Sequence, residues 1–300
     1  RGDQLTIFDR EGNTIQTLGE PDDYSRVSFS PDGSKVVATR GIGGRRGGAR
    51  QLWMFDLVRG IPSRFSTDPD SSASFPVWSP DGNRIVFASL RSGKLNLYQR
   101  LSNGGGEDEL FYKPDEDIYP LSWSRNGRFL GVGAVGADLQ TRWVIPLDDK
   151  GKPAGKPVLF GQRGLGLGVE FSPEANGPPR WVAYQATRDG RTEVYLWEFD
   201  PNSPTLIPAD AGEWQVSKGG GSAPQWNPNG KEVTYVGQRE GSQVYNHYKM
   251  NINGGPEIAI TNNTSGHVDG PEYSPDGKWI YFNGNETGTM QLWRMKPDGT

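Results

Sequence analysis

The sequence contains no cysteine, only two histidines and only four methionines. Without cysteine there is neither a disulfide framework nor thiol chemistry, so the chain can fold in any redox environment. Because His247 and His267 are its only histidines, a Ser-His-Asp triad has few possible members. No Gly-x-Ser-x-Gly and no His-Glu-x-x-His motif occurs. The common signatures of serine and metal hydrolases are therefore missing.

Long apolar runs are missing as well. No stretch approaches the roughly 20 apolar residues that cross a bilayer, and no charged-then-apolar leader precedes Arg1. We therefore expect that any signal or anchor was removed or lies outside this chain, which has no transmembrane segment of its own. The formal net charge of −4 at pH 7 argues against a nucleic-acid partner, which would require a basic face.

Glycine, proline and aromatic residues are abundant. The chain has 42 glycines and 23 prolines in 300 residues, together with ten tryptophans, eleven tyrosines and twelve phenylalanines. This content is excessive for a helical protein, but it is expected where many short strands each need a turn. The aromatic residues recur at equivalent places along the chain, which predicts an aromatic core between repeated units.

One string recurs six times: an aromatic residue, then Ser-Pro-Asp-Gly or a degraded version of it, then a basic residue and an apolar run. The marker residues, each directly after the aromatic, are Ser30, Ser79, Ser124, Ser172, Asn227 and Ser274. Their spacing of 45 to 55 residues is typical of propeller blades. Pro-Asp-Gly is a tight-turn signal, because proline presets φ and glycine accepts a positive φ.

Strand-like runs flank each turn. In the first unit they follow the marker at residues 35–38, 51–55 and 62–65. Four short strands in each unit predict an all-β, six-bladed β-propeller of four-stranded antiparallel blades. Since each repeat buries its faces only against its neighbours, we expect a single domain over residues 1–300.

The two ends of the chain predict how the ring closes. Residues 4–9 and 14–18 resemble the third and fourth strands of a blade, while the last unit supplies strands one to three. We expect the N-terminal strands to pair with the C-terminal blade, since an open propeller would leave exposed edges. Residues 4–9 and residues 290–295 are both predicted to be the third strand of this closing blade. Either the final strand is displaced outward, or the chain is cut from a longer protein.

The aromatic-Ser-Pro-Asp-Gly turn with its basic residue and β-run resembles the hallmark of the PD40-repeat, TolB-like family of bacterial propellers, a WD40-like group. The resemblance covers the chain from about Leu5 to Thr300. Residues 270–299 look like small TolB-related proteins, whereas residues 5–10 and 115–120 resemble propellers attached to membrane-anchored bacterial serine/threonine kinases. The resemblance implies a periplasmic or otherwise extracytoplasmic protein-binding ring. The turns at residues 125–126 and 174–175 depart from the family pattern.

The loops that enter each first strand line the funnel mouth of a propeller, where ligands usually dock. Counting back seven and five residues from the markers selects six binding candidates: Asp23, Ser72, Asp117, Tyr119, His267 and Asp269. Equivalent positions converge on the axis, so we expect Asp23, Asp117, His267 and Asp269 to approach one another. They would form a cation site or an acidic socket for a basic peptide. The alternative is a set of turn-forming aspartates and a surface histidine.

Residues 40–50 form a glycine-rich loop with four arginines, Arg40, Arg45, Arg46 and Arg50. One interpretation is a mobile loop that becomes ordered on an acidic partner surface, because arginine makes bidentate contacts with carboxylates. The other is a solvated insertion, since long loops are tolerated at small cost.

These patterns predict a non-enzymatic propeller that binds a protein or a peptide segment and needs no cofactor. We expect it to be an extracytoplasmic accessory, scaffold or sensor subunit of a larger envelope or membrane complex, at most peripheral to the membrane. The alternative is a propeller lyase or hydrolase that uses a metal or carboxylates at the funnel mouth.

Overall fold

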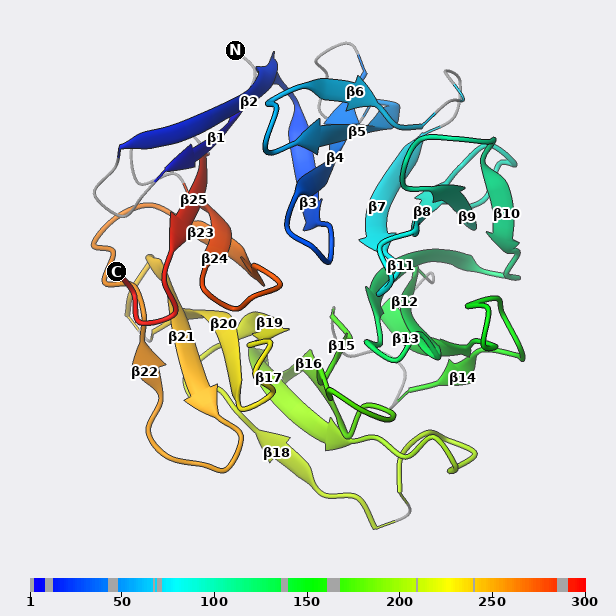
Figure 1. Cartoon of the computed structure of the whole chain (residues 1–300). Helices are drawn as coiled ribbons and strands as arrows, with labels where there is room; N and C mark the ends of the chain where they lie inside the picture. The colour runs from blue at the N-terminus through cyan, green and yellow to red at the C-terminus, as the bar shows by residue number, and fades with distance from the viewer. Residues whose placement is uncertain are drawn as a thin grey trace.

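The computed structural model describes residues 3–8, 13–42, 48–66, 68, 72–135, 140–160, 168–208, 210–239, 241–284 and 291–300. In these residues 25 strands form six sheets around a common axis (Figure 1), and no helix occurs among them. The predicted all-β, six-bladed propeller is therefore confirmed. Across the same residues, nothing helical is long and apolar enough to span a membrane.

Five of the six sheets have four antiparallel strands, with the first strand innermost. Blade 1 contains β3 (Tyr24–Phe29), β4 (Lys35–Gly41), β5 (Arg50–Asp56) and β6 (Pro62–Arg64). Blade 2 contains β7 (Ala73–Trp78), β8 (Arg84–Ser89), β9 (Asn96–Leu101) and β10 (Glu109–Tyr112). Blade 3 contains β11 (Asp117–Trp123), β12 (Phe129–Val135), β13 (Gln140–Pro146) and β14 (Val158–Leu159). Blade 4 contains β15 (Glu170–Phe171), β16 (Trp181–Arg188), β17 (Arg191–Glu198) and β18 (Glu213–Gln215). Blade 5 contains β19 (Ser222–Trp226), β20 (Glu232–Gln238), β21 (Tyr245–Asn251) and β22 (Ile258–Ala259).

Blade 6 departs from the predicted four antiparallel strands, because it has five. Its order is β2 (Thr14–Asp22), β1 (Asp3–Phe8), β25 (Gln291–Met295), β24 (Ile280–Gly284) and β23 (Val268–Tyr273). The N-terminal strands thus pair with the C-terminal blade as predicted, and β25 holds the contested third position. β1 runs parallel to β25. The direction follows from connectivity, because β2 must end where β3 begins and β1 must therefore run the opposite way.

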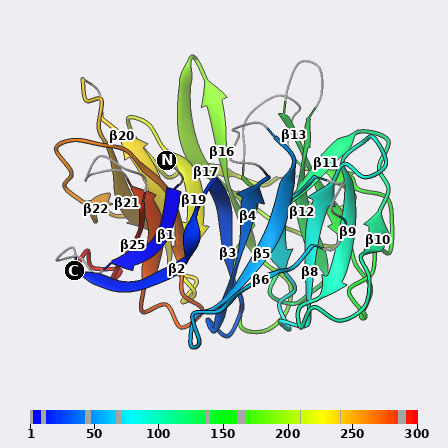
Figure 2. The same ribbon diagram turned by 90° about the horizontal axis from the view of Figure 1, so that it is seen from above.

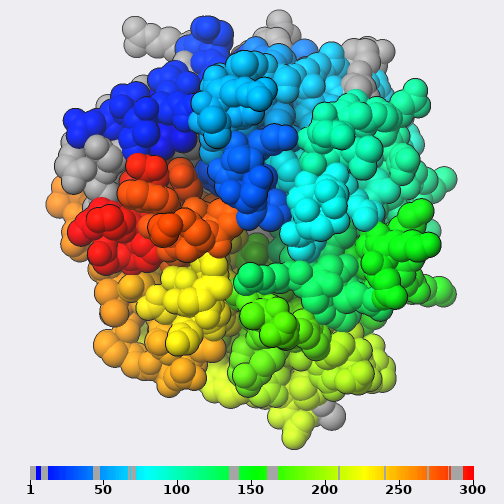
Figure 3. Space-filling model, in the orientation of Figure 1, coloured from blue at the N-terminus to red at the C-terminus, as the bar shows by residue number. Residues whose placement is uncertain are grey.

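The two ends of the ring differ, and we call them the funnel face and the turn face. First strands begin at the funnel face, where the β16–β17 hairpin extends beyond the other blades (Figure 2). The six marker turns lie at the turn face, which is hollowed at its centre (Figure 3). In each clear copy the marker serine accepts a hydrogen bond from the second strand and donates one to the turn aspartate, as Ser30 does with Lys35 N–H and Asp32.

The marker turns of neighbouring blades interlock in part of the ring. A Cβ built on Gly33 would lie 3.4 Å from Pro275 Cδ, and one built on Gly82 would lie 3.8 Å from Pro31 Cδ. A Cβ on Gly127, in the degraded turn of blade 3, would meet nothing within 4 Å. A cavity of about 340 Å³ opens there between blades 2 and 3. A Cβ on Gly230 of blade 5 would likewise meet nothing within 4 Å, so the described turns interlock only from blade 5 through blades 6 and 1 to blade 2.

The core lies between blades, as predicted from the aromatic content. The rings of Phe29 and Tyr281 join blades 1 and 6 at a centroid distance of 4.3 Å. Trp78 Nε1–H donates to the carbonyl of Ser28 across blades 1 and 2, at 3.1 Å. Because the marker aromatics pack against the neighbouring blade, the first strands are held in a fixed arrangement around the axis.

Candidate functional site

The first strands carry kinks near the funnel mouth. Their pairing register with the second strands shifts around the fourth residue before the marker, for example at Arg26, Phe75 and Ala223. There the backbone is left-handed, with φ of 47°, 56° and 49°. Such a conformation costs an L-residue roughly 1–2 kcal/mol. A β-bulge allows a residue to adopt this left-handed conformation within a strand, and it changes the direction in which the side chain points.

The kinked residues of blades 1 and 2 meet a tyrosine of blade 3. The Arg26 guanidinium carbon lies 5.1 Å from the centroid of the Phe75 ring, and that centroid lies 4.6 Å from the Tyr119 ring centroid. Arg26 is exposed, Phe75 is half-buried and Tyr119 is buried. Burial raises the pKa of Tyr119, and the Arg26 charge opposes that rise. We call these three side chains the mouth cluster.

The other half of the ring carries small residues at the same level. Blades 4, 5 and 6 place Gly168, Ala223 and Gly270 at the fourth residue before the marker. A Cβ built on Gly270 would meet no atom within 4 Å. Small residues on blades 4 to 6 thus lie at the level of Arg26 and Phe75; a side-chain atom at Gly270 would have free space, whereas one at Gly168 would lie 3.7 Å from Pro224 Cδ.

Two acidic residues lie further along the first strands, two positions before the marker. Glu272 accepts a hydrogen bond from Phe29 N–H at 2.8 Å, and burial raises its pKa to about 7. Burial raises the pKa of Glu170 well above its ordinary value, the Glu272 charge adds to the rise, and a hydrogen bond from Gln225 opposes it. Both glutamates keep some water contact. The pair therefore carries fewer than two negative charges at neutral pH.

The aspartates predicted at the funnel mouth have intramolecular contacts. Asp117 accepts the backbone N–H of Leu95 at 2.9 Å, and Asp23 lies 3.9 Å from a guanidinium nitrogen of Arg50. Ser72 accepts the backbone N–H of Arg50 at 3.2 Å. These contacts fit the structural alternative for each residue, although they do not test whether a ligand binds there.

The remaining funnel-mouth candidates lie in or next to β23. His267 packs edge-on against Tyr245 at a centroid distance of 4.6 Å. Asp269 lies in β23, opposite Asn283, and its side chain is outside the described part of the structure. Among the described residues no group of three or more His, Cys, Asp or Glu side chains is arranged to hold a metal ion. The predicted convergence of the four titratable residues stays a prediction.

The arginine-rich loop is tied to the propeller at both ends. Arg40 Nε donates to Asp22 at 2.6 Å, and its guanidinium lies 4.4 Å from the Trp53 ring centroid. Arg50 donates to Ser25 Oγ at 2.7 Å. Arg45 and Arg46 lie outside the described residues, so contact of this loop with a partner also stays a prediction.

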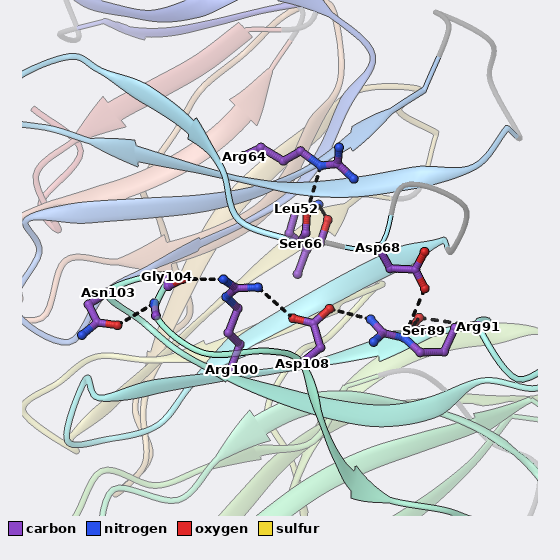
Figure 4. Close-up of polar contacts among 11 residues, drawn as sticks. Leu52, Arg64, Ser66, Asp68, Ser89, Arg91, Arg100, Asn103, Gly104 and Asp108 are labelled. Carbon is purple, nitrogen blue, oxygen red and sulfur yellow. Dashed lines mark hydrogen bonds and ion pairs between the residues drawn. The ribbon is translucent and has the colours of Figure 1, made fainter.

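An ion network in blade 2 lies away from the axis and reaches the segment that connects blades 1 and 2 (Figure 4). The fully buried Asp108 carboxylate lies between Arg91 and Arg100, at 2.6 Å and 3.4 Å. Arg91 also lies 3.9 Å from Asp68 on the segment that leads into β7. Because both guanidinium groups pair with Asp108, this network ties β9 and the β8–β9 turn to the segment that leads into β10, and its charges are already matched.

The search for site residues in the sequence missed those nearest the axis. Arg26 and Phe75 lie four positions before their markers, and Glu170 and Glu272 lie two positions before theirs. The count of seven and five positions found only Tyr119 among the residues described here as a cluster. Aligning every position of the first strands would have revealed an arginine and a glutamate pair where other repeats have small or neutral residues.

Comparisons with known proteins agree with this architecture. The family described as TolB beta propeller domain (PD40) matches residues 169–300. The protein Atu1656 of Agrobacterium fabrum, named as uncharacterized, is 51% identical over 243 residues, which cover 80% of this chain and 68% of that protein.

Solved structures share the fold at low sequence identity. A putative TolB from Agrobacterium tumefaciens superposes with a TM-score of 0.68 at 18% identity, over 91% of this chain and 94% of that one. An oligogalacturonate lyase in complex with manganese superposes with a TM-score of 0.59 at 16% identity, over 97% and 96%. At such identities the likeness shows the fold alone.

Proposed function

Because this chain belongs to the PD40, TolB-like β-propeller family, we propose that it is a non-enzymatic ring that binds a segment of a partner protein at its funnel mouth. It serves as an accessory, scaffold or sensor subunit of a larger envelope or membrane complex, in the periplasm or elsewhere outside the bacterial cytoplasm. The location rests on the family resemblance. The binding role rests on the mouth itself.

The mouth cluster is the observation that carries this proposal. Two neighbouring blades keep a bulky side chain in left-handed backbone at the same position, although neither Arg26 nor Phe75 belongs to the fully buried core. Strained backbone of this kind persists mainly at functional sites, where it aims a side chain. Arginine and aromatic residues also dominate the binding energy of protein interfaces.

One observation favours the enzymatic alternative, a lyase or hydrolase. Glu170 and Glu272 combine raised pKa values with mutual electrostatic contact, and perturbed carboxyl pairs occur in active sites. We prefer the binding role, because burial is the largest cause of both pKa shifts and needs no catalytic function. A hydrolytic or eliminative activity that is lost in Glu272→Gln, while partner binding persists, would favour the alternative.

Site-specific cross-linking tests the binding role. The full chain would carry benzoyl-phenylalanine in place of Phe75 and be illuminated in cells of its bacterial source, and the adducts would be identified by mass spectrometry. The matched control carries the same cross-linker in place of Leu101, which is 52% exposed on the outside of blade 2. We expect one major adduct from the mouth position, absent from the control and indifferent to a chelator. Equal adducts from both positions, or none from the mouth, would contradict the proposal.

A further inference from the structure

Arg26 differs from four other arginines that lie over aromatic rings of third strands. Each of those four pairs with a carboxylate: Arg40 with Asp22, Arg91 with Asp108, Arg188 with Glu213, and Arg239 with Glu257. Arg142, which lies over Tyr184, is buried and donates to the carbonyl of Gln185. Arg26 stacks on Phe75 but has no carboxylate partner within the described residues. Its charge lies at the funnel mouth, and none of the side chains that the structure describes forms an ion pair with it.

The stacking leaves the binding edge of Arg26 accessible. A guanidinium that lies over an aromatic ring keeps its N–H donors in its own plane, where they can form two parallel hydrogen bonds with a carboxylate. The ring and the bulge also restrict the side chain before any ligand arrives, so less conformational entropy is lost on binding. A flexible surface arginine would lack this advantage.

The two axial glutamates, Glu170 and Glu272, form no ion pair with Arg26 among the contacts that the structure describes. Glu272 bonds instead to Phe29 N–H, and Arg26 is not among the causes of its raised pKa. Along a strand, the two positions between the levels of Arg26 and the glutamates span about 6–7 Å. The charge of the mouth therefore changes sign with depth, from a cation at the cluster to a carboxyl pair below it.

We infer that Arg26 binds a carboxylate of the docked partner segment, and that Phe75 receives an apolar side chain of the same segment. The free space at Gly270 leaves room for that segment. This inference rests on the proposed function and specifies its ligand as a carboxylate-bearing peptide. The carboxylate belongs either to the C-terminus of the segment or to an aspartate or glutamate within it.

Fluorescence polarisation with three labelled peptides tests the inference on the full chain. The peptides share one sequence of apolar residues: the first ends in a free carboxylate, the second is amidated and has an internal glutamate, and the third is amidated with glutamine in that place. Wild-type protein is compared with Arg26→Gln and with Arg59→Gln, the control. Arg59 is an exposed arginine on the β5–β6 turn, far along the chain from the mouth cluster.

We expect the first or second peptide to bind wild-type protein at least about tenfold more tightly than the third, because a charged hydrogen bond contributes that much. If the first peptide binds more tightly, the carboxylate is that of the C-terminus; if the second does, it is that of an internal acidic side chain. The preference should vanish in Arg26→Gln and persist in Arg59→Gln. No preference in wild type, or one that survives in Arg26→Gln, overturns the inference. Cross-linking from the Phe75 position would still stand in that case, so the two failures are distinguishable.

Discussion

Glu272 makes the folded protein less stable as the pH rises, whereas most carboxyl groups have the opposite effect. Its pKa rises from an ordinary value of 4.5 to about 7 in the folded protein, chiefly because burial disfavours the charged form. The folded state therefore binds the proton more tightly than the unfolded chain does. This contribution to stability is fully present below pH 4.5 and is lost as the pH rises through 7. At pH 8 the loss amounts to about 3 kcal/mol.

Glu272→Gln isolates this effect. Glutamine cannot ionise, and its carbonyl can still accept the hydrogen bond that Phe29 N–H donates at 2.8 Å. We expect the variant to match wild-type protein near pH 4 and to exceed its free energy of unfolding by about 3 kcal/mol at pH 8. Urea unfolding, followed by tryptophan fluorescence at several pH values, measures the difference.

The control is Glu116→Gln, because Glu116 is an exposed residue just before β11. Its difference from wild type should stay small and flat with pH. The reasoning about the axial carboxyl pair would be refuted if Glu272→Gln were destabilising at pH 8, or if its difference from wild type did not change between pH 4 and pH 8. The other titrating groups are common to the compared proteins; only the titration of Glu170 changes as well, because the Glu272 charge is one cause of its raised pKa.

Three further predictions concern stability and can be measured by urea unfolding. Asp108→Asn removes the buried charge between Arg91 and Arg100 and should lower the free energy of unfolding by about 3–5 kcal/mol, so a change below about 1 kcal/mol would contradict a structural role for the network. Ala223→Gly relieves left-handed backbone and should stabilise by about 0.5–1 kcal/mol, whereas Ala38→Gly in a buried strand should destabilise. Trp78→Phe loses the hydrogen bond to Ser28 and should cost about 1 kcal/mol, and a neutral result would mean that this contact does not hold blades 1 and 2 together.

The blades were predictable because the signal for each is local. A turn such as Pro31-Asp32-Gly33 needs a proline, an aspartate and a glycine with positive φ, and Gly33 has φ of 70°. The recurrence of that short pattern is enough to count the blades. The fifth strand of blade 6 was not predicted in its parallel direction, because that direction depends on where β2 must end and not on the residues of β1.

The site was less predictable, since bulges break the rule that relates sequence to facing side chains. Along a regular strand alternate residues share a face, but one inserted residue shifts the alternation. Counting back from the marker therefore found Tyr119 and missed Arg26 and Phe75, which share its cluster. The raised pKa values of Glu170 and Glu272 depend on burial beside the axis, and no local pattern reports it.

The marker turns interlock around only part of the ring. Prolines pack against the glycine of the next turn at three successive junctions, those of blades 5 and 6, 6 and 1, and 1 and 2, whereas a Cβ built on Gly127 or Gly230 would meet nothing within 4 Å. Two of the three packed junctions flank blade 6, to which both chain ends contribute strands. Because local opening starts where few contacts must break, these turn contacts oppose the separation of blade 6 from its two neighbours.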